Sequence, residues 1–106
     1  MRPQILKRLK EIEEQYNIRI LYACESGSRA WGFSSTNSDY DIRFIYVHKL
    51  DWYLSTQENR DVIEFIEGDL DFSGWELRKS LRLLAKGNPP IQEWLNSPIT
   101  YIEYDS

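Results

Sequence analysis

The stretch that decides the fold begins at Cys24, ends at Tyr46 and has the sequence CESGSRAWGFSSTNSDYDIRFIY. The apolar run that leads into it, residues 18–24, predicts a first strand, and residues 39–47 predict a second. Side chains two positions apart on a strand point to the same face. Asp39, Asp41 and Arg43 are therefore expected on one face of the second strand. The other face is apolar or aromatic and is expected to lie in the core; it consists of Tyr40, Ile42, Phe44 and Tyr46.

Asp39 and Asp41 would place two carboxylates side by side where solvent can reach them. Like charges this close repel each other unless a cation lies between them. A hard divalent cation with oxygen ligands, Mg²⁺ or Mn²⁺, is the expected occupant. The plainer interpretation is that the two aspartates only make a strand edge soluble.

Gly27 and Ser28 follow the first strand directly. Glycine allows close approach to the backbone, and a short helix that begins near Ser28 would offer its N-terminal amides to a phosphate group. Arg29 and Arg43 are further candidates for phosphate contacts. For Arg43, an ion pair with Asp41 is the alternative. Glu25 is interpreted as a charge at the end of the strand, although a supporting role beside the aspartates is also open.

Gly27-Ser28, ten further residues and the Asp39-x-Asp41 pair resemble the motif of the DNA polymerase β-type nucleotidyltransferase superfamily. Its members have a third carboxylate on another strand between hydrophobic residues, and Asp71 matches that description. The longer strings GSRAWG, SDYDIR and DFSGWELRK resemble one branch, the predicted nucleotidyltransferases associated with RNA repair. The resemblance covers roughly residues 22–101.

The resemblance implies an enzyme that transfers a nucleoside monophosphate from a nucleoside triphosphate, such as ATP, to an acceptor hydroxyl with release of pyrophosphate. Asp39 and Asp41 would bind the metal ion on the triphosphate, and Asp71 would complete a second metal site. The nucleotide would be held by Gly27, Ser28, Arg29, Arg43 and Lys79. The acceptor is left open among an RNA end, a protein hydroxyl and a small molecule.

A second interpretation belongs to another functional class. The chain would then be a catalytically silent nucleotide-binding or antitoxin-like module that has the same fold and contacts a protein partner. Turnover of a labelled triphosphate would separate the two interpretations, whereas nucleotide binding alone would not.

The rest of the chain predicts a helix, a hairpin and an uncertain tail. Apolar residues recur at helical spacing over 3–16, which predicts a first helix. Strands are predicted over 62–66 and 70–73, joined by a turn at 67–69. Residues 99–106 are either an edge strand or disordered.

A second long helix is predicted after the hairpin. Ser73 and Glu76 have the spacing of a capping box, which predicts a helix that begins beside Asp71 and ends near Lys86. Its basic residues recur at helical spacing, and Lys79 is expected to contact a triphosphate; the alternative is a solvated face. The predicted buried stripe consists of Leu77, Leu81, Leu84 and Ala85.

At 106 residues the chain is expected to be a single nucleotidyltransferase domain, either a short family member or a protein truncated at its C-terminus. The expected fold is α+β, with two layers: a small mixed sheet with helices on one face, as in the polymerase β palm. The formal charge of −4 argues against electrostatic binding of nucleic acid over a broad basic surface. The oligomeric state is left open.

The single cysteine, Cys24, excludes an intrachain disulfide. It is expected to be a small buried residue on one strand face with Ile18, Ile20 and Tyr22. No apolar run is long enough to cross a bilayer, and the N-terminus lacks the apolar core of a signal peptide, so the expected location is the cytoplasm.

Overall fold

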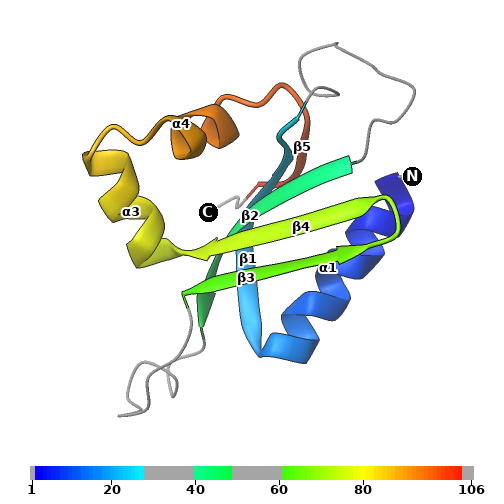
Figure 1. Cartoon of the computed structure of the whole chain (residues 1–106). Helices are drawn as coiled ribbons and strands as arrows, with labels where there is room; N and C mark the ends of the chain where they lie inside the picture. The colour runs from blue at the N-terminus through cyan, green and yellow to red at the C-terminus, as the bar shows by residue number, and fades with distance from the viewer. Residues whose placement is uncertain (1, 28–39, 49–60, 104–106) are drawn as a thin grey trace.

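The computed structural model describes residues 2–27, 40–48 and 61–103 and has the α+β class that the sequence predicts. Its elements are α1 (Arg2–Tyr16), β1 (Ile18–Glu25), β2 (Tyr40–His48), β3 (Val62–Glu67), β4 (Leu70–Glu76), α3 (Leu77–Ala85), α4 (Pro89–Leu95) and β5 (Thr100–Glu103). The strands form one five-stranded sheet in the order β3-β4-β2-β1-β5 (Figure 1). β2 and β4 are parallel and the other neighbours are antiparallel, so the sheet is mixed, as predicted.

The central strand β2 sets the register of the site. Its parallel pairing with β4 places Asp41 beside Asp71 and Arg43 beside Ser73. The predicted hairpin between β3 and β4 is confirmed, and Gly68 in its turn has a φ of 58°, a conformation that glycine adopts without strain. The tail forms the edge strand β5 next to β1.

The first helix covers one face of the sheet. Its apolar stripe, Ile5, Leu9 and Ile12, is fully buried in one cluster with the predicted core face of β2. Asn17 ends the helix with a φ of 56°, which is typical of a residue that follows a helix C-terminus. This face is therefore a closed apolar layer.

On the opposite face of the sheet, the helices of the described residues cover one end. There α4 brings Ile91 and Trp94 into a cluster with Ile45 of β2, and the Trp94 ring stacks on Trp75 of β4 with 4.1 Å between the ring centroids. The prediction had the helices on one face, whereas α3 and α4 lie against the other. The cause is that this face of β2 is apolar at Ile45 and charged at Asp41, so a helix packs at one end and leaves the other open.

A β-bulge in β1 changes which residues share a face. The pairing of β1 with β2 shifts between Ile20 and Tyr22, so the simple alternation along the strand breaks there. Ile18 and Ile20 lie in the cluster under α1, whereas Tyr22 and Cys24 lie in the cluster under α4. The predicted shared face is therefore wrong, although Cys24 is buried as predicted, and burial raises the pKa of its thiol to about 12.

The helix after the hairpin begins later than predicted. β4 continues through Ser73 to Glu76, and α3 begins at Leu77. Glu76, rather than Ser73, is the N-cap, and its carboxylate accepts the N–H of Arg78 at 2.9 Å. Pairing of Ser73 within the sheet outweighs its local capping tendency. The extended segment from Asp71 to Leu77 spans about 20 Å, so α3 does not begin beside Asp71.

The buried face of α3 also differs from the prediction. Ser80 is only 3% exposed, whereas Leu81 is 54% and Leu84 39% exposed. Leu77 and Leu83 are the leucines of α3 that pack against the cluster under α4. None of the helices in the described part of the chain is both long and apolar enough to cross a membrane.

Candidate functional site

Two carboxylates from neighbouring strands meet on the open part of the sheet. Asp41 of β2 and Asp71 of β4 are partners in the parallel register and point to the same face. Their side chains are 31% and 36% exposed, so each is held by the sheet and reached by solvent. The sequence placed them on separate strands, and the structure brings them together.

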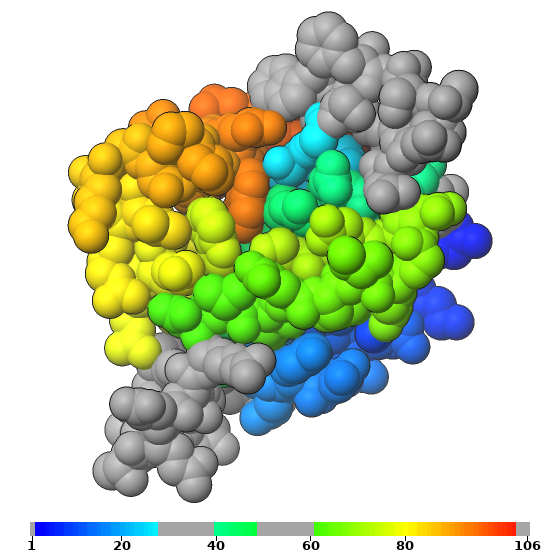
Figure 2. All heavy atoms as spheres, in the orientation of Figure 1, coloured from blue at the N-terminus to red at the C-terminus, as the bar shows by residue number. Residues whose placement is uncertain are grey.

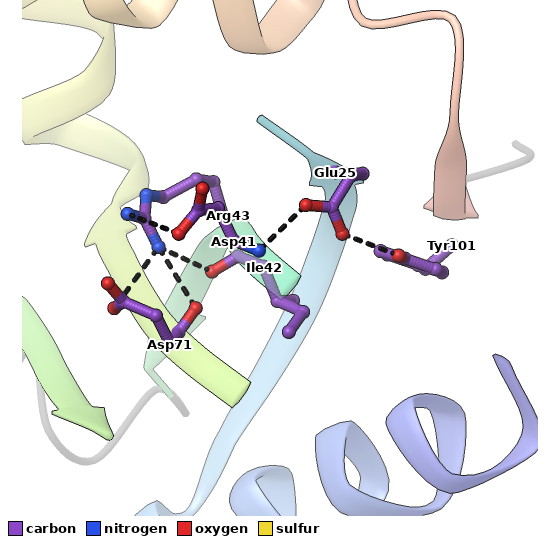
Figure 3. A network of polar contacts seen from close by, with 6 residues as sticks. All are labelled: Glu25, Asp41, Ile42, Arg43, Asp71 and Tyr101. Carbon is purple, nitrogen blue, oxygen red and sulfur yellow. Dashed lines mark hydrogen bonds and ion pairs between the residues drawn. The ribbon is translucent and has the colours of Figure 1, made fainter. Parts of the chain in front are cut away.

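The Arg43 side chain lies between these carboxylates (Figure 3). Its Nη1 donates to the carbonyl oxygen of Asp71 at 3.0 Å and lies 3.4 Å from Oδ1 of the same residue, while its Nη2 lies 3.8 Å from Oδ1 of Asp41. The expected ion pair between Arg43 and Asp41 is therefore present, and Asp71 is a second and closer partner. The guanidinium offsets the repulsion of the two negative charges.

Gly27 lies against the Asp41 carboxylate. A Cβ atom at this position would overlap Oδ2 of Asp41. Glycine thus lets the backbone approach the carboxylate in its present position, and its backbone angle is not unusual. The sequence predicted close approach at Gly27, but to a triphosphate, and that expectation stays a prediction.

Glu25 was interpreted from the sequence as a strand-end charge, and this interpretation is wrong. Its side chain is only 1% exposed. It accepts two hydrogen bonds of 2.7 Å, from the backbone N–H of Asp41 and from the hydroxyl of Tyr101. Sequence alternation could not reveal this contact, because the bulge in β1 and the pairing with β5 decide where Glu25 points.

A hollow of about 500 Å³ extends from Arg43 and Asp71 towards the edge strand β3. Its lining includes Glu64 and Ile66 of β3 and Ser73 of β4, which the sequence did not indicate as site residues. Ile66 is 72% exposed although it is a large apolar residue next to Asp71 in the sheet. In Figure 2, β3 and β4 run across the front of the molecule, so this edge of the sheet is open to solvent.

The remaining predicted site residues are placed as follows. Ser28, Arg29 and Asp39 lie outside the described residues. Lys79 lies on α3, beyond the far end of β4 from Asp71, so the expectation that its helix begins beside the carboxylates is wrong. Of the other basic residues on α3, Arg78 lies 3.7 Å from Glu76 and Arg82 lies 3.6 Å from Asp61.

Of the three aspartates expected to bind a metal ion, the structure describes Asp41 and Asp71. Within residues 2–27, 40–48 and 61–103, no group of three or more His, Cys, Asp or Glu residues is arranged to hold a metal ion. Asp69, the other acidic residue near the hairpin, is exposed in the turn, where its carbonyl oxygen accepts the N–H of Tyr40 at 2.8 Å. Asp71, not Asp69, is the residue of this segment that lies beside Asp41.

Two comparisons with known proteins show the family of the chain. A family model described as "RNA repair pathway DNA polymerase beta family" matches residues 1–106. A protein of Bacillus subtilis (strain 168), named uncharacterized protein YcgL, is 60% identical over 104 residues. That match covers 97% of this chain and 40% of the relative, so the chain spans less than half the length of the curated relative it matches.

Proposed function

This chain belongs to the RNA repair pathway DNA polymerase beta family, and from that premise we propose that it is a metal-dependent nucleotidyltransferase. It would transfer a nucleoside monophosphate from a nucleoside triphosphate, with ATP as the first candidate, to an acceptor hydroxyl. An RNA end is the first acceptor to test, because the family description names RNA repair. The observation that supports the proposal most is the in-register pair of Asp41 and Asp71 on the open face.

The carboxylate pair fits a hard divalent cation. Asp41 and Asp71 offer oxygen ligands from adjacent strands, and a cationic group, the Arg43 guanidinium, is already attracted to both. Mg²⁺ or Mn²⁺ would be held by these two residues together with Asp39, which the sequence places on the same face as Asp41. When bound, such an ion stabilises charge on the triphosphate and favours ionisation of the acceptor hydroxyl.

The chain's own residues would bind and orient the reactants. Gly27, Ser28 and Arg29 would contact the triphosphate, and Arg43 would donate hydrogen bonds to its phosphate oxygens. Asp71 borders the hollow, so the acceptor hydroxyl would approach from that side. The acceptor hydroxyl would lose its proton to water while its oxygen bonds to the α-phosphorus. The bond from that phosphorus to the bridging oxygen would break, and pyrophosphate would leave with the electron pair.

Lys79 is less well supported as a triphosphate ligand than the other residues are. It was proposed as a triphosphate ligand on the expectation that α3 begins beside Asp71, and that expectation is wrong. A Lys79→Ala variant is therefore expected to bind a triphosphate as tightly as the unmodified protein. Weaker binding would return Lys79 to the site.

The experiment is incubation with Mg²⁺ and each α-labelled triphosphate while RNA, protein and small-molecule acceptors are offered in turn. Asp71→Asn is expected to abolish transfer and to leave triphosphate binding nearly intact, because Asp71 serves the acceptor side. Asp69→Asn is the matched control, an acidic residue two positions away in the turn, and should retain most of the activity.

Three outcomes would contradict the proposal in different ways. If Asp69→Asn were inactive and Asp71→Asn active, the third carboxylate of the mechanism would be Asp69 and not Asp71. Full activity in both variants would exclude a mechanism that depends on the carboxylate pair of Asp41 and Asp71. Triphosphate binding without turnover under any condition would favour the silent nucleotide-binding module.

A further inference from the structure

The starting observation is a buried carboxylate that accepts hydrogen bonds from two neighbouring strands, β2 and β5. Glu25 ends β1 and is removed from solvent, which is unfavourable for a charged group unless hydrogen bonds replace its hydration. Two donors reach it: the backbone N–H of Asp41 bonds to Oε2, and the Tyr101 hydroxyl bonds to Oε1, both at 2.7 Å. Short hydrogen bonds to a carboxylate are among the stronger polar contacts in proteins.

Asp41 is held by three consecutive residues at the end of β1. The Glu25 carboxylate accepts its N–H, the N–H of Ser26 donates to its carbonyl oxygen at 2.8 Å, and Gly27 packs against its carboxylate. Both backbone polar groups and the side chain of Asp41 are thus fixed from one side. A metal ligand is effective only when it is held to within about half an ångström, so this support matters for binding.

Tyr101 extends this support to the edge strand β5. Its hydroxyl fixes the orientation of the Glu25 side chain. The N–H of Glu25 donates to the carbonyl oxygen of Ile99, the residue before β5, at 2.9 Å, so this segment holds both the side chain and the backbone of Glu25. Burial and the bond to Glu25 raise the pKa of the Tyr101 hydroxyl, which therefore stays protonated and able to donate. Figure 3 shows the contacts as a line from Tyr101 through Glu25 to Asp41.

We infer that Glu25 and Tyr101 are positioning residues that hold Asp41 in the geometry needed to bind a divalent cation and its triphosphate. This inference rests on the proposed function of the same site. It makes β5 part of the site, although the strand contributes no residue that lines the hollow.

The chain offers a matched control for the test. Tyr101→Phe removes one phenol hydrogen bond and keeps the ring. Tyr22→Phe also removes one phenol hydrogen bond of 2.7 Å, from Tyr22 to the carbonyl oxygen of Trp94, in the cluster under α4. A loss that followed only from a weaker fold would appear in both variants, whereas a loss of positioning would appear in Tyr101→Phe alone.

Three quantities are measured for the full chain: the affinity for Mn²⁺ with a non-hydrolysable triphosphate, the hydrogen-exchange rate of the Asp41 amide, and the midpoint of denaturant unfolding. Tyr101→Phe is expected to lower Mn²⁺ affinity about tenfold, the lower end of the range for partners of metal ligands, and to speed exchange at Asp41. Tyr22→Phe should lower the unfolding midpoint similarly and leave Mn²⁺ affinity unchanged.

Glu25→Gln provides a second variant with the same side-chain volume. One amide oxygen replaces two carboxylate oxygens, so at least one of the two donors loses its acceptor. Because both residues act through one network, the double variant with Tyr101→Phe should lose no more Mn²⁺ affinity than the worse single variant. Independent, additive losses would overturn the inference.

Equal Mn²⁺ affinity and equal Asp41 exchange in Tyr101→Phe and Tyr22→Phe would also overturn it. If the unmodified protein binds no Mn²⁺ with any triphosphate, the proposed function fails instead. The exchange rate of the Asp41 amide still decides in that case whether Glu25 and Tyr101 fix the backbone, because it does not depend on a ligand.

Discussion

The two faces of β2 have different roles, although successive residues of the strand point to them in alternation. Ile42, Phe44 and Tyr46 point towards α1 and are fully buried. Asp41 and Arg43 point the other way and remain partly exposed. The closed face therefore supplies the free energy that holds the strand in place, and the open face can hold charged groups without loss of the core.

The comparison predicts that substitutions on the two faces separate stability from binding. A change on the closed face should lower the free energy of unfolding and affect the site only through unfolding. A change on the open face should alter ligand binding in a protein that remains folded.

The largest effect is expected for Phe44→Ala on the closed face. Phe44 is fully buried in the cluster under α1, and removal of such a ring leaves a cavity. The free energy of unfolding should fall by about 3–5 kcal/mol, measured by denaturant unfolding. A loss below about 1 kcal/mol would show that this face is not the main source of stability.

Gly74→Ala should have the next largest effect, again on stability. A Cβ atom on Gly74 would overlap the ring of Phe44, and the ring is enclosed by the core. The overlap must therefore be relieved by a shift of the packed layer, at a cost of about 1–3 kcal/mol. Unchanged unfolding would mean that the ring can move and that the closed face is looser than its burial indicates.

Gly27→Ala is the counterpart on the open face. Its Cβ atom would overlap Oδ2 of Asp41, the far end of a partly exposed side chain that can turn away. Stability should change by less than about 1 kcal/mol, while Mn²⁺ affinity should fall about tenfold as the carboxylate is displaced. Unchanged Mn²⁺ affinity of the variant, measured by water-proton relaxation, would show that the close approach of Gly27 to Asp41 is not needed for metal binding.

The smallest effect is expected at the rim of the closed face, where Arg8 of α1 meets Glu67 of β3. Arg8 donates two hydrogen bonds to the Glu67 carboxylate, at 2.7 and 2.8 Å, and this contact lowers the pKa of Glu67 from its usual 4.5. A carboxylate whose pKa is lowered by folding stabilises the fold at every pH above its pKa in the unfolded chain. This contribution is lost as the pH falls through its pKa in the folded protein. Because the pair is solvent-screened, the contribution is below about 1 kcal/mol.

Glu67→Gln measures this contribution. The difference in unfolding free energy between the variant and the unmodified protein should be present at pH 7 and disappear as the pH falls below about 4.5, the ordinary value for this group. A difference that grows on acidification would have the wrong sign for a carboxylate with a lowered pKa.

Alternation along β2 was enough to predict both of its faces, because a strand buried on one side has only two ways to orient its residues. The spacing of Asp39 and Asp41 indicated a pair of carboxylates, and the resemblance to the family indicated Asp71 through its apolar neighbours, before any pairing was known. That Asp71 lies beside Asp41 depends on the parallel register of β2 and β4, which no local pattern of either strand contains.

The errors share a physical cause, which is that tertiary contacts outweighed local signals. The bulge near Tyr22 moved Cys24 to the other face, and sheet pairing of Ser73 delayed the start of α3. The position of α3 on the sheet then buried Ser80 and left Leu81 exposed, against the helical pattern of its leucines. A supporting role for Glu25 was left open but not favoured, because its partner, Tyr101, lies 76 positions away in the sequence.

That separation has a consequence for the time at which the site becomes complete. A chain grows from its N-terminus and begins to fold during synthesis, so β1, β2 and the β3–β4 hairpin can associate before Tyr101 has been made. Until β5 adds to β1, Glu25 lacks the hydroxyl that orients it, and contacts over such a distance form late because loop closure must precede them. If the site binds as proposed, competence to bind would therefore appear only after β5 has added to β1, so that a nascent chain without β5 would not sequester metal ions or nucleotides.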